Sequence, residues 1–180
     1  MAFQRMKKGG KTTRKRLPTD ITKEEFLHLL DSVPERRHKL AIGLGWGSGL
    51  RISEVLHLEK YDFNFDNRQL KVRQGKGNKD RIVPIPKYFR EEFLELIPFQ
   101  FEARSMQKVF KRSCEKSGLL AKKPSVVFHS LRHGFATHAL KKGVSLRAIQ
   151  KMLGHADLSS TGIYLDLCPE DIMAEYKDKF

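Results

Sequence analysis

The chain has 180 residues, enough for one domain with a sizeable core, and its hydrophobic fraction of 39% is ordinary for a soluble globular protein. Lys and Arg number 35 against 21 Asp and Glu, and the net charge of +14 favours a polyanionic partner such as nucleic acid. No stretch has the apolar length of a membrane span or the layout of a secretory signal, and Cys114 and Cys168 form no disulfide framework or zinc motif. We therefore expect an intracellular protein whose partner is a nucleic acid and not a membrane.

Residues 1–16 contain seven of the surplus basic residues and no acidic one. This composition predicts a flexible tail rather than a packed segment, and the charge that remains in residues 17–180 is still basic. We expect the tail to contact DNA phosphates through Lys7, Lys8, Arg14, Lys15 and Arg16.

The first ordered elements are predicted to be helices. Thr22 and Glu25 have the spacing of a capping box, and apolar residues follow at helical intervals. Residues 37–47 are predicted to form a buried second helix that ends before Gly49, and residues 51–58 a short third helix.

A β-hairpin is predicted next. Residues 69–73 alternate with period two, residues 75–78 (GKGN) form a turn, and residues 81–85 resume an extended run in which Pro84 restricts the second strand to a sheet edge. Helical spacing then returns, with Gly118 and Gly143 as stops and Ser145 as a cap, over residues 88–97, 104–117, 129–142, 145–153 and 170–177. The fold class expected is mainly α with a small antiparallel β-hairpin or sheet (α+β).

Several short motifs contain groups that could carry chemistry, although each alone has an ordinary explanation. Arg51 and Glu54 are neighbours on one helical face, as in many surface ion pairs. Lys76 lies between two glycines, where a solvated turn is the simpler explanation. His129 and Arg132 share a helical face at the start of a helix. His155 follows a glycine that ends a helix.

Tyr164 comes nine residues after His155 and could simply be half-buried with a hydrogen-bonded hydroxyl group. A metal site is the other possibility raised by the histidines, because His129 and His133 have the i,i+4 spacing of a ligand pair. No glutamate follows His129, so the pattern of a zinc protease fails and no metal is expected.

Taken together and in order, these residues resemble the signature of the tyrosine recombinases, a family that includes phage integrases, Xer recombinases and Cre. The blocks "GLRISEVLHL", "GKGNKDRIVPI", "HSLRHGFATHAL" and "LGHADLSSTGIYL" resemble family blocks of the Xer and prokaryotic integrase branch. The resemblance runs from about Leu17 to the C-terminus, so residues 17–180 are expected to form the catalytic domain. Most family members also carry an N-terminal core-binding domain, which we expect to be absent from this chain.

The resemblance implies a strand transferase that cleaves DNA through a 3′-phosphotyrosyl intermediate without metal, ATP or any other cofactor. Tyr164 would be the nucleophile, Arg51 and Arg132 with His155 would bind the phosphate oxygens, and Lys76 would protonate the 5′ oxygen. His129 would assist proton transfer, and Glu54 would orient the cluster. Lys79 and Arg81 are further expected DNA contacts, and Lys79 is the competitor to Lys76 as the acid.

The partner expected is double-stranded DNA with a specific recombination site. The chain is expected to be a monomer free in solution and a homotetramer on DNA, because the family exchanges its C-terminal segment between subunits. Residues 169–180 would be that segment, docking through Ile172, Met173, Tyr176 and Phe180, unless this stripe packs on its own domain. Rival interpretations are a type IB topoisomerase, a non-catalytic DNA-binding protein, and a metal hydrolase using His129, His133 and His138.

Overall fold

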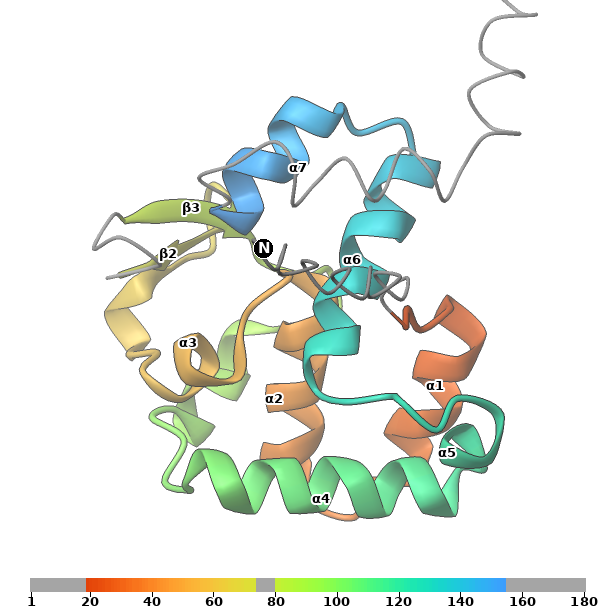
Figure 1. The fold of residues 1–180 in the computed structure, drawn as a ribbon. Coiled ribbons are helices and arrows are strands. Elements are labelled where there is room, and N and C mark those ends of the chain that lie inside the picture. The colour runs from red at the N-terminus through yellow and green to blue at the C-terminus, as the bar shows by residue number, and fades with distance from the viewer. Residues whose placement is uncertain (1–18, 74–79, 155–180) are drawn as a thin grey trace, which may run out of the picture.

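The protein is described by a computed structural model that covers residues 19–73 and 80–154 (Figure 1). The α-helices in these ranges are α1 (Lys23–Asp31), α2 (Arg36–Gly47), α3 (Ile52–Leu56), α4 (Ala103–Lys116), α5 (Leu119–Lys122), α6 (His129–Lys141) and α7 (Leu146–Leu153). Two 3-10 helices, η1 (Lys60–Asp62) and η2 (Glu91–Leu96), and the strands β1 (Phe63–Asn64), β2 (Gln69–Val72) and β3 (Arg81–Pro84) complete them. The predicted fold class is confirmed. None of the helices in the two ranges is long and apolar enough to cross a membrane.

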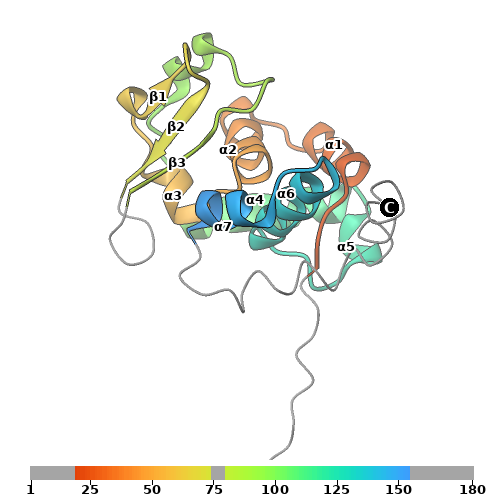
Figure 2. The ribbon, with the colours of Figure 1, turned by 90° about the horizontal axis from the view of Figure 1, so that it is seen from above.

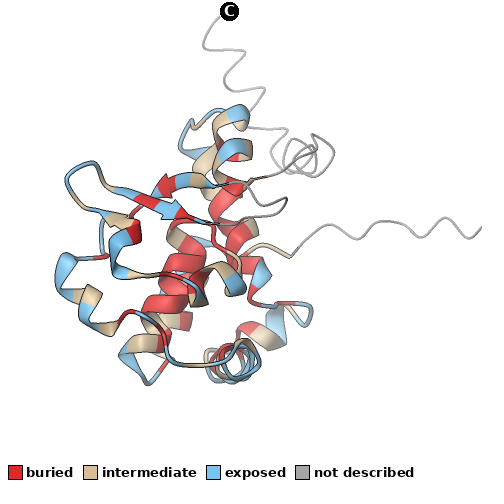
Figure 3. Cartoon of the chain, turned by 90° about the vertical axis from the view of Figure 1, so that its left-hand side faces the viewer, coloured by how far each residue is buried: buried red, intermediate tan, exposed pale blue. Residues whose placement is uncertain are grey.

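The helices surround a central pair. α2 and α6 pack against each other, α4 crosses one end of α2, and α1 lies on the side away from the sheet (Figures 1 and 2). α7 contacts both α6 and β3, so it bridges the helical part and the sheet. Buried residues are concentrated in the middle of the molecule, where these elements meet (Figure 3).

The contact between α2 and α6 depends on a small residue. A Cβ atom added to Gly134 would lie 2.1 Å from the ring of Trp46 and 2.6 Å from the carbonyl oxygen of Ile21. The Trp46 ring also stacks on Phe26 of α1, with ring centroids 4.8 Å apart. Three helices therefore interlock at this point, and α6 has a fixed depth against α2.

The helix ends largely follow the sequence signals. The Thr22 hydroxyl accepts a hydrogen bond from the Glu25 amide at 3.3 Å, and the Glu25 carboxylate accepts one from the Thr22 amide at 2.8 Å, which confirms the capping box. Ser145 caps α7 by accepting from the Ala148 amide. Gly118 and Gly143 adopt positive φ angles just beyond α4 and α6, as their predicted role as stops requires.

The sheet contains the predicted hairpin and one additional strand. β2 and β3 pair antiparallel, from Gln69 opposite Pro84 to Val72 opposite Arg81, and β3 lies at the edge as Pro84 predicts. β1 pairs with the other side of β2 and was not predicted, because two residues are too few to produce an alternating pattern.

The prediction of a helix over residues 88–97 is wrong. Only Glu91–Leu96 is helical, as a 3-10 helix, and the Phe89 amide bonds to the Pro86 carbonyl in a preceding turn. Phe89 is fully buried, with its ring stacked 5.0 Å from Phe63 and edge-on to Phe93 at 5.7 Å. Burial of these aromatic rings outweighs the helical preference that the Glu and Leu residues of the segment confer.

Candidate active site

The turn between α2 and α3 positions Arg51. Gly49 has a φ of +65°, which reverses the chain after α2, and Arg51 then occupies the cap position at the start of α3. The Glu54 carboxylate accepts a hydrogen bond from the Arg51 amide at 2.8 Å and forms an ion pair with the Arg51 guanidinium at 2.8 Å. Arg51 and Glu54 are therefore neighbours, as their spacing in the sequence predicts. The Arg51 side chain remains 25% exposed.

Arg132 lies on α6 and is among the largest fully buried side chains, with 1% of it exposed. Its Nη1 donates to the Gly49 carbonyl at 2.7 Å and lies 4.0 Å from the Glu54 carboxylate. Its Nη2 donates to the Leu153 carbonyl at the end of α7. Arg132 therefore joins α6 to the turn that carries Arg51 and to the residue pair that precedes His155.

Glu54 is the point at which the predicted clamp residues meet. Burial would raise the pKa of this carboxyl, but hydrogen bonds from the Arg81 side chain and the Arg51 amide outweigh it and lower the pKa to about 2. The carboxylate consequently stays ionised at neutral pH and contacts Arg51, Arg81 and Arg132. In the described part of the chain, three guanidinium groups share this single carboxylate, which leaves the cluster suited to binding an anion.

His129 opens α6 beside this cluster. Partial desolvation and the positive charges of Arg132 and Arg51 lower the pKa of its imidazole. The ring packs edge-on against His133, with centroids 4.8 Å apart. A groove of about 540 Å³ runs beside it, with Arg51, Lys111 and His129 at its polar side and Val126 and Phe128 among its apolar walls.

Residues 19–73 and 80–154 contain no group of three or more His, Cys, Asp or Glu side chains placed to hold a metal ion. Several predicted site residues lie outside the described ranges. They are Lys76, Lys79, His155 and Tyr164, the tail residues Lys7, Lys8, Arg14, Lys15 and Arg16, and the C-terminal segment 169–180 with its docking stripe.

Arg81 occupies a different setting from the one that its predicted role as a DNA contact suggests. Its side chain is 8% exposed and is hydrogen-bonded to Glu54 and to the Met152 carbonyl. Sequence reasoning missed this arrangement because Arg81 and Glu54 are separated by 27 positions and belong to different elements.

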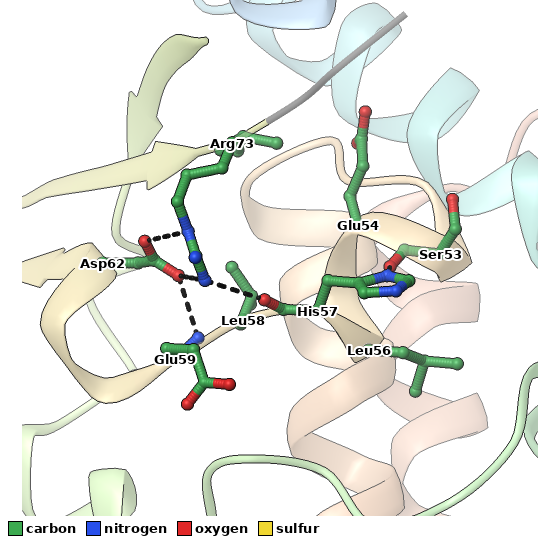
Figure 4. A pocket seen from close by; sticks show the side chains of 9 residues that line it. Ser53, Glu54, Leu56, His57, Leu58, Glu59, Asp62 and Arg73 are labelled. Atoms are coloured by element: carbon green, nitrogen blue, oxygen red, sulfur yellow. Dashed lines mark hydrogen bonds and ion pairs between the residues drawn. The ribbon is translucent and has the colours of Figure 1, made fainter. Parts of the chain in front are cut away.

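The sequence also did not predict a second ion pair, which lies beside the site. The Asp62 carboxylate binds the Arg73 guanidinium at 2.8 and 3.0 Å, and Arg73 also donates to the His57 carbonyl just beyond α3 (Figure 4). These residues line a pocket of about 440 Å³ together with Glu54 and Ser53. Arg73, directly after β2, thus ties η1 and the end of α3 to the sheet. No local sequence pattern indicates it.

Comparison with known proteins gives the family. A model described as the phage integrase family matches residues 19–98 and 98–170, and the chain belongs to this family. It is 39% identical over 176 residues to the tyrosine recombinase XerA of Thermococcus kodakarensis, covering 87% of this chain and 61% of that protein. It is 35% identical over 173 residues to the tyrosine recombinase XerC of Chlamydia trachomatis serovar L2, covering 82% of this chain and 54% of that protein. The chain thus spans about three fifths or less of the length of these curated relatives.

Solved structures agree with the fold. A crystal structure of XerA recombinase matches with a TM-score of 0.70 at 24% identity, covering 91% of this chain and 66% of that one. XerH site-specific recombinase, in a post-cleavage complex with a palindromic difH substrate, matches with a TM-score of 0.75 at 25% identity, covering 93% and 55%. The resemblance inferred from the sequence is confirmed at the level of family and fold.

Proposed function

We propose that this chain is the catalytic part of a site-specific DNA recombinase that cleaves and rejoins strands of double-stranded DNA through Tyr164. The observation that carries the proposal is the meeting of Arg51 and Arg132 at the Glu54 carboxylate, with His129 beside them. The two arginines come from distant parts of the chain and meet at one carboxylate, and Arg51 is the more exposed of them, at 25% against 1% for Arg132. The DNA complex of the related XerH recombinase supports the same class of substrate.

The chemistry follows from the charges of the cluster. The Tyr164 oxygen attacks phosphorus, the bond from phosphorus to the 5′ oxygen breaks, and the non-bridging oxygens gain negative charge in between. Arg51 and Arg132 stabilise that charge because guanidinium groups stay protonated and their donors are fixed in advance. His155 adds a further donor.

Proton transfers complete the step. His129 accepts the proton of the Tyr164 hydroxyl, a role that its lowered pKa supports, because the imidazole is then neutral at pH 7. Lys76 gives a proton to the departing 5′ oxygen. The product is a 3′-phosphotyrosyl bond and a free 5′ hydroxyl, and attack by the 5′ hydroxyl of a partner strand reverses the reaction without metal or ATP.

We extend the proposal to the assembly. The chain is a monomer in solution and forms a homotetramer on a specific DNA site, with residues 169–180 exchanged between subunits and residues 1–16 contacting phosphates. It acts on DNA in the cytoplasm, in a prokaryotic or viral context.

The test uses a library of nicked duplexes whose central sequence is randomised, so that the released fragment diffuses away and covalent complexes accumulate. Adducts that survive denaturation are isolated and sequenced for the DNA and mapped by mass spectrometry for the tyrosine. The expected result is an adduct on Tyr164 that disappears in Tyr164→Phe and persists in Tyr61→Phe, a matched change at a tyrosine that is 75% exposed. DNA binding without any adduct would favour the non-catalytic alternative, and an adduct on another tyrosine would refute the assignment.

A further inference from the structure

Arg81 connects three elements that the proposed reaction depends on. It is the first residue of β3, and its Nη1 and Nη2 donate to the two carboxylate oxygens of Glu54 at 2.9 and 2.8 Å. Its Nε donates to the Met152 carbonyl at 2.6 Å. One guanidinium thereby joins β3, α3 and the last turn of α7.

The end of α7 is held by two arginines rather than one. Arg81 binds the Met152 carbonyl, and Arg132 binds the next carbonyl, that of Leu153. Both arginines also approach Glu54. Gly154 follows immediately, and a Cβ atom added there would lie 3.2 Å from the Arg81 Cδ atom. The packing leaves little room between Arg81 and the residue that precedes His155.

The partners of Arg81 separate it from the two clamp arginines. Both of its terminal nitrogens bind the Glu54 carboxylate, its Nε donates to the Met152 carbonyl, and its side chain is 8% exposed. Arg132 is also buried, but its terminal nitrogens donate to neutral carbonyl groups, and it approaches the carboxylate only at 4.0 Å. Arg51, the neighbouring arginine on the same carboxylate, is 25% exposed and has its remaining donors available on the side of the groove. A phosphate can therefore reach Arg51 without displacing a partner, whereas at Arg81 it would have to compete with Glu54.

We propose that Arg81 is a positioning residue, which fixes Glu54, and through it Arg51, relative to the C-terminal end of α7 and does not bind DNA. This inference rests on the proposed function, since the groups that it positions are the phosphate clamp and the residue that precedes His155. The role requires an arginine. Only a planar fork with a third donor at Nε can bind both oxygens of one carboxylate and a carbonyl at the same time, whereas lysine has a single nitrogen.

The experiment compares Arg81→Lys and Arg81→Gln with wild type on a nicked duplex selected from the library. The rate of adduct formation at saturating protein and the dissociation constant at several salt concentrations are measured separately. Both variants should form the adduct roughly tenfold to a hundredfold more slowly, because the clamp is present but misplaced. The dissociation constant should change less than about threefold and its salt dependence should stay unchanged, since no phosphate contact is lost. Arg90→Gln removes the same charge from a side chain that is 73% exposed and should leave the rate unchanged.

A double variant tests whether Arg81 acts through Glu54. The double variant Arg81→Gln/Glu54→Gln should form the adduct at most about threefold more slowly than Glu54→Gln alone. The carboxylate that Arg81 binds is already missing in Glu54→Gln, so removing Arg81 as well should have little further effect on the rate. If the rate losses of the two single variants multiply in the double variant, the inference is overturned. If Arg81→Gln fails to fold, Arg81→Lys, which keeps the charge, carries the comparison, with thermal unfolding to show that the variant is folded.

The remaining outcomes distinguish this inference from the proposed function. Weaker binding with a reduced salt dependence and a normal rate at saturation would make Arg81 a DNA contact and refute the positioning role. A wild-type rate in both Arg81 variants would refute the positioning role alone. Failure of wild-type protein to form any adduct would refute the proposed function, and this inference with it.

Discussion

Replacing Glu54 by glutamine should cost about 3 kcal/mol of folding stability at neutral pH. The carboxyl is 7% exposed, and its pKa falls from an ordinary 4.5 to about 2 in the folded chain because the hydrogen bonds from Arg81 and Arg51 outweigh the cost of burial. A shift of that size corresponds to about 3 kcal/mol at roughly 1.4 kcal/mol per pH unit. Glutamine keeps the shape and loses the charge, so the variant should lose this contribution and leave buried guanidinium groups without their carboxylate.

The pH dependence makes the prediction specific. A carboxyl whose pKa is lowered by folding stabilises the protein above its unfolded pKa, and this stabilisation is lost as the pH falls toward its folded pKa. For Glu54 the loss therefore spans about pH 5 to pH 2, and the gap between wild type and Glu54→Gln should shrink by about 2 kcal/mol between pH 6 and pH 3. Urea unfolding of both proteins at a series of pH values measures it, and titrating groups that do not interact with Glu54 cancel in the difference. A gap below about 1 kcal/mol at pH 7, or one that stays constant down to pH 3, would refute the reasoning.

Three further predictions concern the reaction itself. Arg51→Ala and Arg132→Ala should each slow adduct formation by roughly a hundredfold or more, and Arg51→Lys should rescue poorly because lysine lacks the fork; near-wild-type cleavage in Arg51→Lys would exclude a bidentate contact. Lys76→Ala should be rescued by a bridging 5′-thio phosphate, whose thiolate leaves without a proton, whereas rescue of Lys79→Ala instead would identify the other lysine as the acid. Deletion of residues 169–180 should abolish higher-order complexes on DNA while leaving single-site binding, and sedimentation that still detects tetramers would mean that the segment packs on its own domain.

Local signals were sufficient for most of the fold. The Thr22 capping box, the Ser145 cap and the stops at Gly118 and Gly143 each depend on residues within a few positions of one another, and each is present in the structure. The helix expected over residues 88–97 does not form because the Phe89 ring stacks on Phe63 of β1 and the Tyr88 hydroxyl donates to the Gly43 carbonyl of α2, contacts that only the tertiary structure reveals.

The candidate site, like the fold, could be predicted from the sequence only in part. The i,i+3 spacing was enough to place Arg51 beside Glu54, and family resemblance was enough to connect them with Arg132. The setting of Arg81 was not predictable, because a basic residue after a hairpin turn has the same appearance in the sequence whether it faces DNA or a buried carboxylate. The bonds from Arg81 to the buried Glu54 carboxylate and to the Met152 carbonyl form only when α3, β3 and α7 meet.

Gly134 constrains the candidate active site, because its close packing fixes the position of α6, the helix that carries Arg132. Even a methyl group there would collide with Trp46 and with the Ile21 carbonyl, so substitutions would push α6 outward and carry Arg132 with it. Variants that keep the fold should therefore retain Gly134 and tolerate changes at exposed positions along the groove, such as Lys111 and Val127. One glycine thus constrains the depth of α6, whereas the exposed positions along the groove are free of that constraint.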